Sequence, residues 1–286
     1  MYFIRKNLKF IIFSIPVLLI SIMGSAYFFQ DYLIFRPNSY FRKPEEVGME
    51  NIKLITIKTE DGEILNAWFK APEDVNEKVF LYFHGNSRSL ARNTAIISNL
   101  IHHNSSILAI DYRGYGGSTG YPSIEGIYAD ARAAVRYLKE NDITMDRVVV
   151  VGYSLGTAPA ARTAATENIA GIIFISPYST IEDVSHYYLP FAPVKCLLKH
   201  NFDALADARK ITVPTLVMHG TYDWLVPYRF GVKLFENIAS PSKEMLTFER
   251  SGHWFAFDAK LLEDIKPFLI KLSEKAEIKP RSLSEN

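Results

Sequence analysis

The sequence predicts an α/β fold with a mostly parallel central sheet that is flanked by helices. Short runs rich in Val, Ile and Phe alternate along the chain with segments of helical periodicity, which is typical of such sheets. A G-x-S-x-G pentapeptide at residues 152–156 directly follows one apolar run and precedes an alanine-rich segment at 157–165. This order of strand, tight turn and helix is the setting that exposes a nucleophilic serine at a sheet edge.

The expected strands can be placed in chain order. Residues 51–57 and 63–70 are expected to pair as antiparallel strands, because Glu60, Asp61 and Gly62 between them form a typical turn sequence. The remaining strands are expected where apolar runs end in turn residues, at 79–83, 107–111, 148–152, 171–176, 213–218 and 245–248.

Helical periodicity marks two further segments. One apolar stripe consists of Ile127, Ala131, Ala134, Val135 and Leu138, and a second one consists of Leu261, Ile265, Phe268 and Leu269. We therefore expect one catalytic domain over residues 51–276, followed by a flexible tail at 277–286.

An irregular insertion occupies about residues 177–208, after the strand that follows the pentapeptide. It is rich in Tyr, Leu, Pro and Phe, and we expect it to form a small cap over the active site. The alternative is that it packs against the sheet edge as ordinary helices. As a cap, its aromatic and aliphatic side chains would suit an apolar acyl chain better than a charged substrate.

The amino terminus predicts a membrane helix. Residues 10–29 contain no charged side chain, and about twenty apolar residues are enough to cross a bilayer as a helix. We expect residues 1–30 to comprise a cytoplasmic amino terminus and a signal anchor, and residues 31–50 to be a linker. Basic residues before the span place the catalytic domain on the non-cytoplasmic side.

Two alternatives to the anchor stay open. Gly24, Ser25 and Ala26 offer a small-residue site at which a signal peptide would be cleaved. The segment is otherwise a buried amino-terminal helix.

Ser154, at the centre of the pentapeptide, is the expected nucleophile. Glycines must flank it because the turn leaves no room for side chains, and the serine itself must adopt a strained backbone conformation. Residues 116–120 also match G-x-S-x-G, but Tyr121 and Pro122 follow them, so a helix cannot begin there directly. We therefore interpret Ser118 as part of a glycine-rich loop.

A serine hydroxyl needs a base, and the base needs an acid that orients it. In this setting the partners follow in the order Ser, acid, His. Asp223 lies in the loop after the expected strand at 213–218, and His253 is the one histidine that follows it. We predict Asp223 as the acid and His253 as the base. The alternatives are a turn or helix-capping carboxylate for Asp223 and a surface-loop role for His253.

Two backbone N–H groups are expected to bind the oxyanion that forms during acyl transfer. One belongs to Leu155, the residue after the nucleophile. The other is assigned to Asn86, because the strand at 79–83 ends in a His84-Gly85 turn and glycine lets the backbone approach a substrate. We expect His84 to hold this loop by a hydrogen bond rather than to act as the base.

Composition excludes several functional classes. The formal net charge of +1 gives no electrostatic reason to expect a nucleic-acid partner. The single cysteine, Cys196, excludes an internal disulfide and a multi-cysteine metal site. The sequence has no H-E-x-x-H or comparable ligand cluster, and we expect neither a metal nor a cofactor.

Five phrases carry a family resemblance: LIFRP at 33–37, HGNS at 84–87, DYRGYGGS at 111–118, the pentapeptide at 152–156, and HGTYDWLVP at 219–227. In this order they resemble the α/β-hydrolases, and in particular the single-pass, membrane-anchored α/β-hydrolase-domain serine hydrolases. The resemblance implies the α/β-hydrolase fold and serine hydrolase activity.

The sequence therefore predicts a serine hydrolase that cleaves acyl esters or thioesters with a lipid-like acyl group, as a carboxylesterase, lipase or thioesterase does. The expected partners are this acyl substrate and a membrane. The enzymatic alternative is a serine aminopeptidase of the same fold, for which Glu182 and Asp183 would be the acidic residues near the cap. A non-catalytic binding protein on the same scaffold is a remote alternative, because every member of the predicted triad is present.

Overall fold

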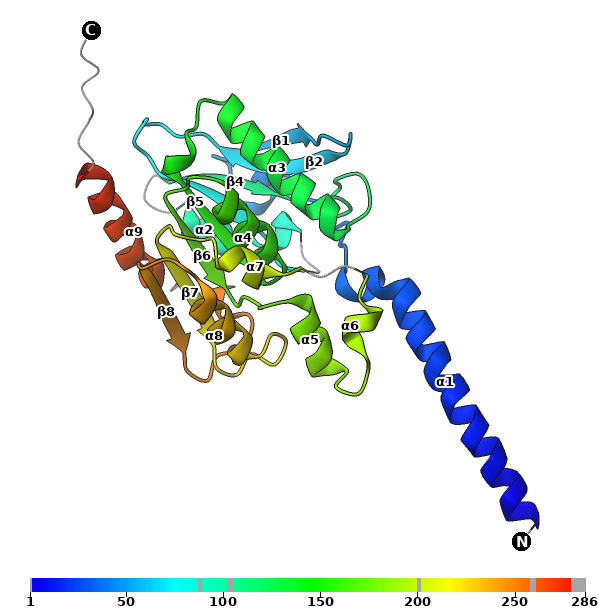
Figure 1. The fold of residues 1–286 in the computed structure, drawn as a ribbon. Coiled ribbons are helices and arrows are strands. Elements are labelled where there is room, and N and C mark those ends of the chain that lie inside the picture. Colours follow the sequence, from blue (N-terminus) through cyan, green and yellow to red (C-terminus); the bar gives the residue numbers. More distant parts are fainter. Residues whose placement is uncertain (1, 87–88, 102–104, 200–201, 258–260, 279–286) are drawn as a thin grey trace.

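The computed structural model describes residues 2–86, 89–101, 105–199, 202–257 and 261–278 (Figure 1). Its centre is an eight-stranded sheet with the strand order β1-β2-β4-β3-β5-β6-β7-β8. The strands are β1 (Lys53–Lys58), β2 (Ile64–Lys70), β3 (Val79–Phe83), β4 (Ser106–Ile110), β5 (Val148–Tyr153), β6 (Gly171–Ile175), β7 (Thr215–Gly220) and β8 (Lys243–Phe248). Strand β2 pairs antiparallel with β1 and β4, and the other neighbours pair in parallel. The predicted α/β fold is confirmed.

Helices cover both faces of this sheet (Figure 1). The α-helices are α1 (Tyr2–Ile34), α2 (Thr94–Leu100), α3 (Ile124–Glu140), α4 (Thr157–Thr166), α5 (Ile181–Tyr188), α6 (Val194–Leu197), α7 (Ala204–Ala208), α8 (Tyr228–Asn237) and α9 (Leu261–Ile278). The 3-10 helices are η1 (Pro44–Val47), η2 (Leu90–Arg92), η3 (Met145–Arg147), η4 (Ser154–Gly156) and η5 (Phe255–Phe257). Helices α3, α4, α7 and α8 bury apolar side chains on one face, and α2 and α9 do so on the other.

Helix α3 illustrates how the pattern of apolar residues specifies an element. Its amino terminus is capped by Ser123, whose hydroxyl oxygen accepts from the backbone N–H of Gly126 at 3.1 Å. The predicted apolar stripe lies against the sheet, and all of its members are buried: Ile127, Ala131, Ala134, Val135 and Leu138. Burial of one face against the sheet supplies most of the stability of such a helix.

The parallel register brings the carboxyl ends of six strands, β3 to β8, to one edge of the sheet. Phe83 at the end of β3 lies opposite Gly152 in β5, and Gly220 at the end of β7 lies opposite Phe248 in β8. The loops after these strands therefore share one edge, which is where open α/β sheets bind their ligands. All five predicted site residues lie in these loops.

Helix α1 contains one non-helical residue, Phe29, and its amino-terminal end projects away from the sheet (Figure 1). Its described side chains are not packed as in a buried helix, since Phe13 is 73% exposed and Phe28 is 70% exposed. Among the described residues, no helix is both long and apolar enough to cross a membrane. The transmembrane helix predicted at 10–29 is thus not found among them. Part of that span lies outside the described side chains, which exclude those of residues 1–12, 15, 16 and 19.

The segment predicted as a linker, residues 31–50, is packed into the domain. Helix α1 extends to Ile34, and Phe35 directly after it is 1% exposed. Met49 near the end of the segment is 7% exposed in the core on the other face of the sheet. At the other end of the chain, α9 continues to Ile278, and the rest of the predicted tail lies outside the described residues.

The predicted insertion at 177–208 divides into two parts. Helix α7 packs into the core beside α4, where Ala204 and Ala208 are fully buried. Helices α5 and α6 instead protrude beside the carboxyl end of α1 (Figure 1), and between them Phe191 is fully exposed. The hydroxyl of Tyr188 in α5 donates to the carbonyl oxygens of Trp224 and Leu225, both at 2.9 Å. The protruding part thus lies next to the loop that contains Asp223.

Candidate active site

Ser154 occupies a sharp turn between β5 and α4, as the pentapeptide predicts. Its φ is +51°, in the left-handed region that non-glycine residues rarely adopt. The turn requires glycine at positions 152 and 156, because neighbouring atoms leave no room for a Cβ at either position. A Cβ at Gly152 would lie 2.6 Å from the Cβ of Ala160, and a Cβ at Gly156 would lie 2.1 Å from the carbonyl oxygen of Phe83.

A methyl group at position 156 is therefore expected to be strongly destabilising. The oxygen that it would meet belongs to the backbone of β3, which cannot move without disturbing the sheet. We expect Gly156→Ala to lower the free energy of unfolding by about 3 kcal/mol, measured by urea denaturation. The matched control is Gly24→Ala, since a Cβ at Gly24 meets no atom within 4 Å. Equal stability of the two variants would contradict this account of the turn.

The structure brings the three predicted reactive residues into one hydrogen-bonded line. Nε2 of His253 lies 3.0 Å from Oγ of Ser154, and Nδ1 of His253 lies 2.7 Å from Oδ2 of Asp223. Ser154, Asp223 and His253 are 7%, 5% and 2% exposed, respectively. The line is therefore shielded from bulk water, which strengthens the electrostatic interactions within it.

The loops after β7 and β8 hold the acid and the imidazole in place. The second carboxylate oxygen of Asp223 accepts from the backbone N–H groups of Leu225 and Val226, at 3.0 and 2.8 Å. The carbonyl oxygen of His253 accepts from the Tyr153 hydroxyl at 3.2 Å. Backbone N–H groups thus hold the Asp223 carboxylate, and the Tyr153 hydroxyl holds the backbone of His253, as precise positioning requires.

A second histidine, His219, contacts the acid. Its Nε2 lies 2.8 Å from the carbonyl oxygen of Val226 and 3.2 Å from Oδ2 of Asp223. A carbonyl oxygen can only accept, so Nε2 carries the proton. Burial alone would raise the pKa of Asp223, but hydrogen bonds from His219 and His253 outweigh it and hold that pKa below its ordinary value. Asp223 is therefore a carboxylate at neutral pH.

The sequence reasoning missed His219, although the signal was present. His219 and Asp223 are four residues apart in the phrase HGTYD, and the strand end and the turn after it bring them together. Gly231 in α8 makes room for the ring, because a Cβ there would lie 2.1 Å from Nδ1 of His219.

The two predicted oxyanion residues lie in the turn of Ser154 and in the loop after β3. Leu155 directly follows it and is 4% exposed. Asn86 lies in the loop after β3, which packs tightly onto the turn, since a Cβ at Gly85 would be 2.8 Å from the Tyr153 ring. His84 is fully buried, and its Nδ1 lies 2.7 Å from the carbonyl oxygen of Gly85. Burial lowers the pKa of His84 to about 4, so it is a neutral residue that holds the loop, as expected.

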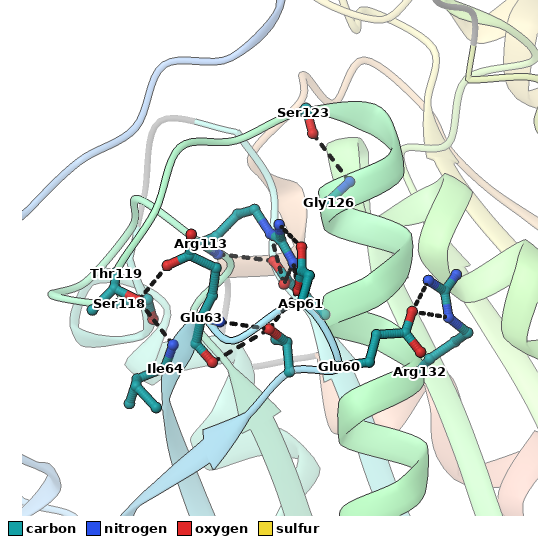
Figure 2. A network of polar contacts seen from close by, with 12 residues as sticks. Glu60, Asp61, Glu63, Ile64, Arg113, Ser118, Thr119, Ser123, Gly126 and Arg132 are labelled. Atoms are coloured by element: carbon teal, nitrogen blue, oxygen red, sulfur yellow. Dashed lines mark hydrogen bonds and ion pairs between the residues drawn. The ribbon is translucent and has the colours of Figure 1, made fainter.

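The second G-x-S-x-G match forms a loop, in agreement with the sequence analysis. The hydroxyl of Ser118 donates to the carbonyl oxygen of Asp111 and accepts from the N–H of Asn66, both at 2.9 Å. Figure 2 shows the polar network around this loop, in which Arg113 reaches Asp61 with an N–O distance of 2.7 Å. Ser118 is therefore a structural residue.

In the part of the chain that the structure describes, no group of three or more His, Cys, Asp or Glu side chains is arranged so that it could hold a metal ion. The buried polar contacts of the site instead link two histidines to Asp223 directly. A hydroxyl beside an imidazole that a carboxylate orients is the arrangement that nucleophilic catalysis uses.

Fold and site together define a protein of the α/β type with a serine at a nucleophile turn. Comparisons with known proteins give the same result. Residues 78–189 match the α/β hydrolase fold family, and residues 183–260 match the family described as serine aminopeptidase, S33. The chain belongs to the α/β-hydrolase superfamily.

Relatives are found in bacteria and animals. An uncharacterized protein of Mycobacterium tuberculosis is 30% identical over 66% of this chain and 68% of its own length. The α/β hydrolase domain-containing protein aho-3 of Caenorhabditis elegans is 31% identical over 66% of this chain and 56% of its own length. The uncharacterized protein YfhR of Salmonella typhimurium is 27% identical over 93% of this chain and 94% of its own length.

Two solved structures illustrate the shared fold. An esterase of Pyrococcus furiosus superposes with a TM-score of 0.65 at 20% identity, covering 85% of this chain and 97% of its own. Est1E from Butyrivibrio proteoclasticus, solved with ferulic acid, superposes with a TM-score of 0.64 at 21% identity, covering 76% of this chain and 98% of its own.

Proposed function

We propose that this hydrolase cleaves acyl esters or thioesters through Ser154, His253 and Asp223. The observation that carries the proposal is the continuous hydrogen-bonded line from Oγ of Ser154 through His253 to Asp223. The line begins at a serine whose backbone is held in the left-handed region at the edge of the sheet. Nucleophilic hydrolases that form acyl-enzymes use this combination of groups.

In the proposed reaction, Oγ of Ser154 attacks the carbonyl carbon of the substrate while its proton passes to Nε2 of His253. The carbonyl electron pair moves onto oxygen, and collapse of this intermediate expels the alcohol or thiol, which takes the proton from His253. Water then loses a proton to His253 and attacks the acyl carbon. Collapse of this second intermediate releases the acid and expels Oγ of Ser154, which takes the proton back from His253. Asp223 keeps the proton on Nδ1 of His253 and stabilises the charged imidazole in each step.

The backbone N–H groups of Asn86 and Leu155 are proposed to bind the oxyanion. Each such donor contributes about 3 to 4 kcal/mol to the stability of the transition state. The close packing of Gly85 against Tyr153 supports this assignment, because it keeps the loop after β3 beside the nucleophile.

An apolar acyl group is the substrate feature that the surroundings favour. The protruding part of the insertion exposes Tyr187, Tyr188, Leu189 and Phe191, and it lies next to the loop of Asp223. The fold neighbours that carry the name esterase are consistent with this class of substrate.

A serine aminopeptidase is the second candidate, because residues 183–260 match that family. Such an enzyme needs an anionic group that binds the amino terminus of its substrate. Asp183, one of the two acidic residues considered for this role, instead pairs with Lys233 at 2.7 Å and accepts from the Ser179 hydroxyl. This pairing favours the esterase.

Labelling with a fluorophosphonate probe, followed by turnover of p-nitrophenyl esters of increasing chain length, tests the proposal. We expect labelling at Ser154 and a higher kcat/KM for ester substrates than for aminoacyl p-nitroanilides. Preference for the anilides would favour the aminopeptidase, and absence of both labelling and turnover would favour a binding protein.

We also propose that residues 10–29 attach the protein to a membrane, with the catalytic domain on the non-cytoplasmic side. The exposure of apolar side chains along α1, among them Phe13, Ile20 and Phe28, supports this proposal, because such a surface is stable in contact with hydrocarbon.

Deletion of residues 1–29 is expected to release an active protein into the soluble fraction. The deletion spares Gln30, which bonds to the insertion, and the packed segment that follows. The full chain should stay in the membrane pellet after a carbonate wash, since burial of apolar area does not depend on charge. Full chain in the wash supernatant with Met1 intact would contradict the anchor, and an amino terminus near Tyr27 would indicate a cleaved signal peptide. Protease added outside sealed vesicles tests the orientation.

A further inference from the structure

The side chain of Asn86 is bonded to a part of the chain that is far away in sequence. Its Nδ2 donates to the carbonyl oxygen of Ile34 at 2.6 Å, and its Oδ1 accepts from the backbone N–H of Arg36 at 2.9 Å. The hydroxyl of Tyr115 donates to the same Oδ1 at 2.7 Å. The carboxamide of Asn86 is thus hydrogen-bonded both to the backbone at the carboxyl end of α1 and to one buried tyrosine.

The chain that leaves α1 continues across neighbouring loops. We refer to residues 30–41 as the strap. The carbonyl oxygen of Asn38 accepts from the N–H of Gly116 at 2.9 Å, and the carbonyl oxygen of Tyr40 accepts from the hydroxyl of Ser89, shortly after Asn86. The strap therefore contacts the loop after β3 at two places and the glycine-rich loop at a third.

The first part of the strap is anchored by side-chain contacts of Gln30 and Phe35. Gln30 donates to the carbonyl oxygen of Leu197 at 3.2 Å and accepts from the N–H of Lys199 at 2.8 Å, both in the insertion. Phe35 is 1% exposed and packs edge-to-face on Phe202, with ring centroids 6.1 Å apart. These contacts fix the two backbone groups to which Asn86 is bonded.

We propose that the strap positions the oxyanion loop through the side chain of Asn86. The proposal rests on the function proposed above, in which the backbone N–H of Asn86 binds the oxyanion. A residue whose side chain is held by three separate groups has little freedom to rotate its backbone N–H. Ile34, Arg36 and Tyr115 are thus positioning residues, which act on the reaction through Asn86.

Tyr115 is suited to this task because it is completely buried and cannot readily lose its proton. Burial raises the pKa of its hydroxyl well above the ordinary value, so the hydroxyl remains a donor to Asn86. On the other side of the loop, the Tyr112 hydroxyl donates to the carbonyl oxygen of His84 at 3.0 Å. Hydrogen bonds from two buried tyrosines therefore hold this loop at Asn86 and at His84.

Two variants of the full chain test the proposal with p-nitrophenyl butyrate as substrate. Asn86→Ala removes all three side-chain bonds but keeps the backbone N–H, and we expect kcat to fall about 100-fold. Tyr115→Phe removes a single hydrogen bond, and we expect kcat to fall about fivefold. KM should stay within about twofold in both variants, because a donor that acts on the oxyanion stabilises the transition state rather than the bound ester.

Binding of an alkyl trifluoromethyl ketone gives a second readout that a merely structural role would not change. In the proposed site, Oγ of Ser154 attacks the carbonyl carbon of the ketone. The resulting oxyanion is stabilised by the same backbone N–H donors as the oxyanion of the reaction. Its inhibition constant should therefore rise in each variant by about the factor by which kcat falls. The matched control is Tyr137→Phe, which removes a hydroxyl from α3, where the ring packs on Phe69, and should change neither quantity.

Unchanged kcat and ketone affinity in Tyr115→Phe and Asn86→Ala would overturn the role of the strap. A rise in KM with constant kcat would overturn it as well, since that pattern reports ground-state binding. Absence of probe labelling at Ser154 in the unmodified chain would instead overturn the proposed function on which this inference rests.

Discussion

Replacement of Ser154 by alanine is expected to lower kcat for p-nitrophenyl butyrate by about a million-fold and to abolish fluorophosphonate labelling. In the proposed reaction this hydroxyl forms the covalent bond to the acyl carbon, so no other part of the site can replace it. Residual turnover would come from substrate binding and the oxyanion donors alone. The fold should persist, because the side chain is small and its removal leaves little empty space. Burst kinetics measure the loss of turnover, and circular dichroism of the same sample measures whether the fold persists.

Ser118→Ala is the matched control, because it removes a serine from the other G-x-S-x-G sequence. Its hydroxyl bonds to Asp111 and Asn66, so we expect a loss of about 1 to 3 kcal/mol in stability with labelling retained. Loss of labelling in Ser118→Ala but not in Ser154→Ala would mean that the nucleophile has been assigned to the wrong serine.

Asp223→Asn is expected to lower kcat by about 10,000-fold while the protein remains folded. An amide at this position is neutral, so it cannot stabilise the charged imidazole, and it can orient His253 with the wrong nitrogen protonated. Unchanged turnover in Asp223→Asn would move the acid elsewhere, and Glu249 and Asp203 would be the next residues to replace.

The same variant tests the electrostatics of the acid. The pKa of Asp223 is held below its ordinary value in the folded protein, so the carboxylate contributes stability above its unfolded pKa of about 3.9. That contribution is lost as the pH falls toward the lower pKa of the folded state. Urea denaturation should therefore show a difference between the unmodified chain and Asp223→Asn that narrows below about pH 4. A constant difference from pH 7 to pH 3 would contradict the lowered pKa.

The fold and the residues of the hydrogen-bonded line, Ser154, His253 and Asp223, could be predicted from the sequence because both depend on local signals. Apolar runs place the strands, and the pentapeptide places Ser154 at the end of one of them. Chain order then restricts the base to His253, since no other histidine follows Asp223. The register of the sheet brings these loops to one edge, as parallel strands require.

The surroundings of the site could not be predicted in the same way. Phe35 and Asn86 are about fifty residues apart in sequence, and no periodic pattern links the strap to the oxyanion loop. The sequence of residues 31–50 shows no clear helix or strand pattern, so it predicts a linker. In the structure, however, Phe35 and Met49 of this segment are buried. The four-residue spacing of His219 and Asp223 indicates that the two lie close together, but not that Nε2 of His219 faces Oδ2 of Asp223.

The backbone of Ser154 has a consequence for the evolution of this site. Holding a non-glycine residue at a φ of +51° costs about 1 to 2 kcal/mol, and the surrounding sheet must supply that energy in every folded molecule. Glycine would relieve the cost at once, but it has no hydroxyl. If Ser154 is the nucleophile as proposed, activity and thermodynamic stability oppose each other at this one position, and selection for stability alone would replace the serine.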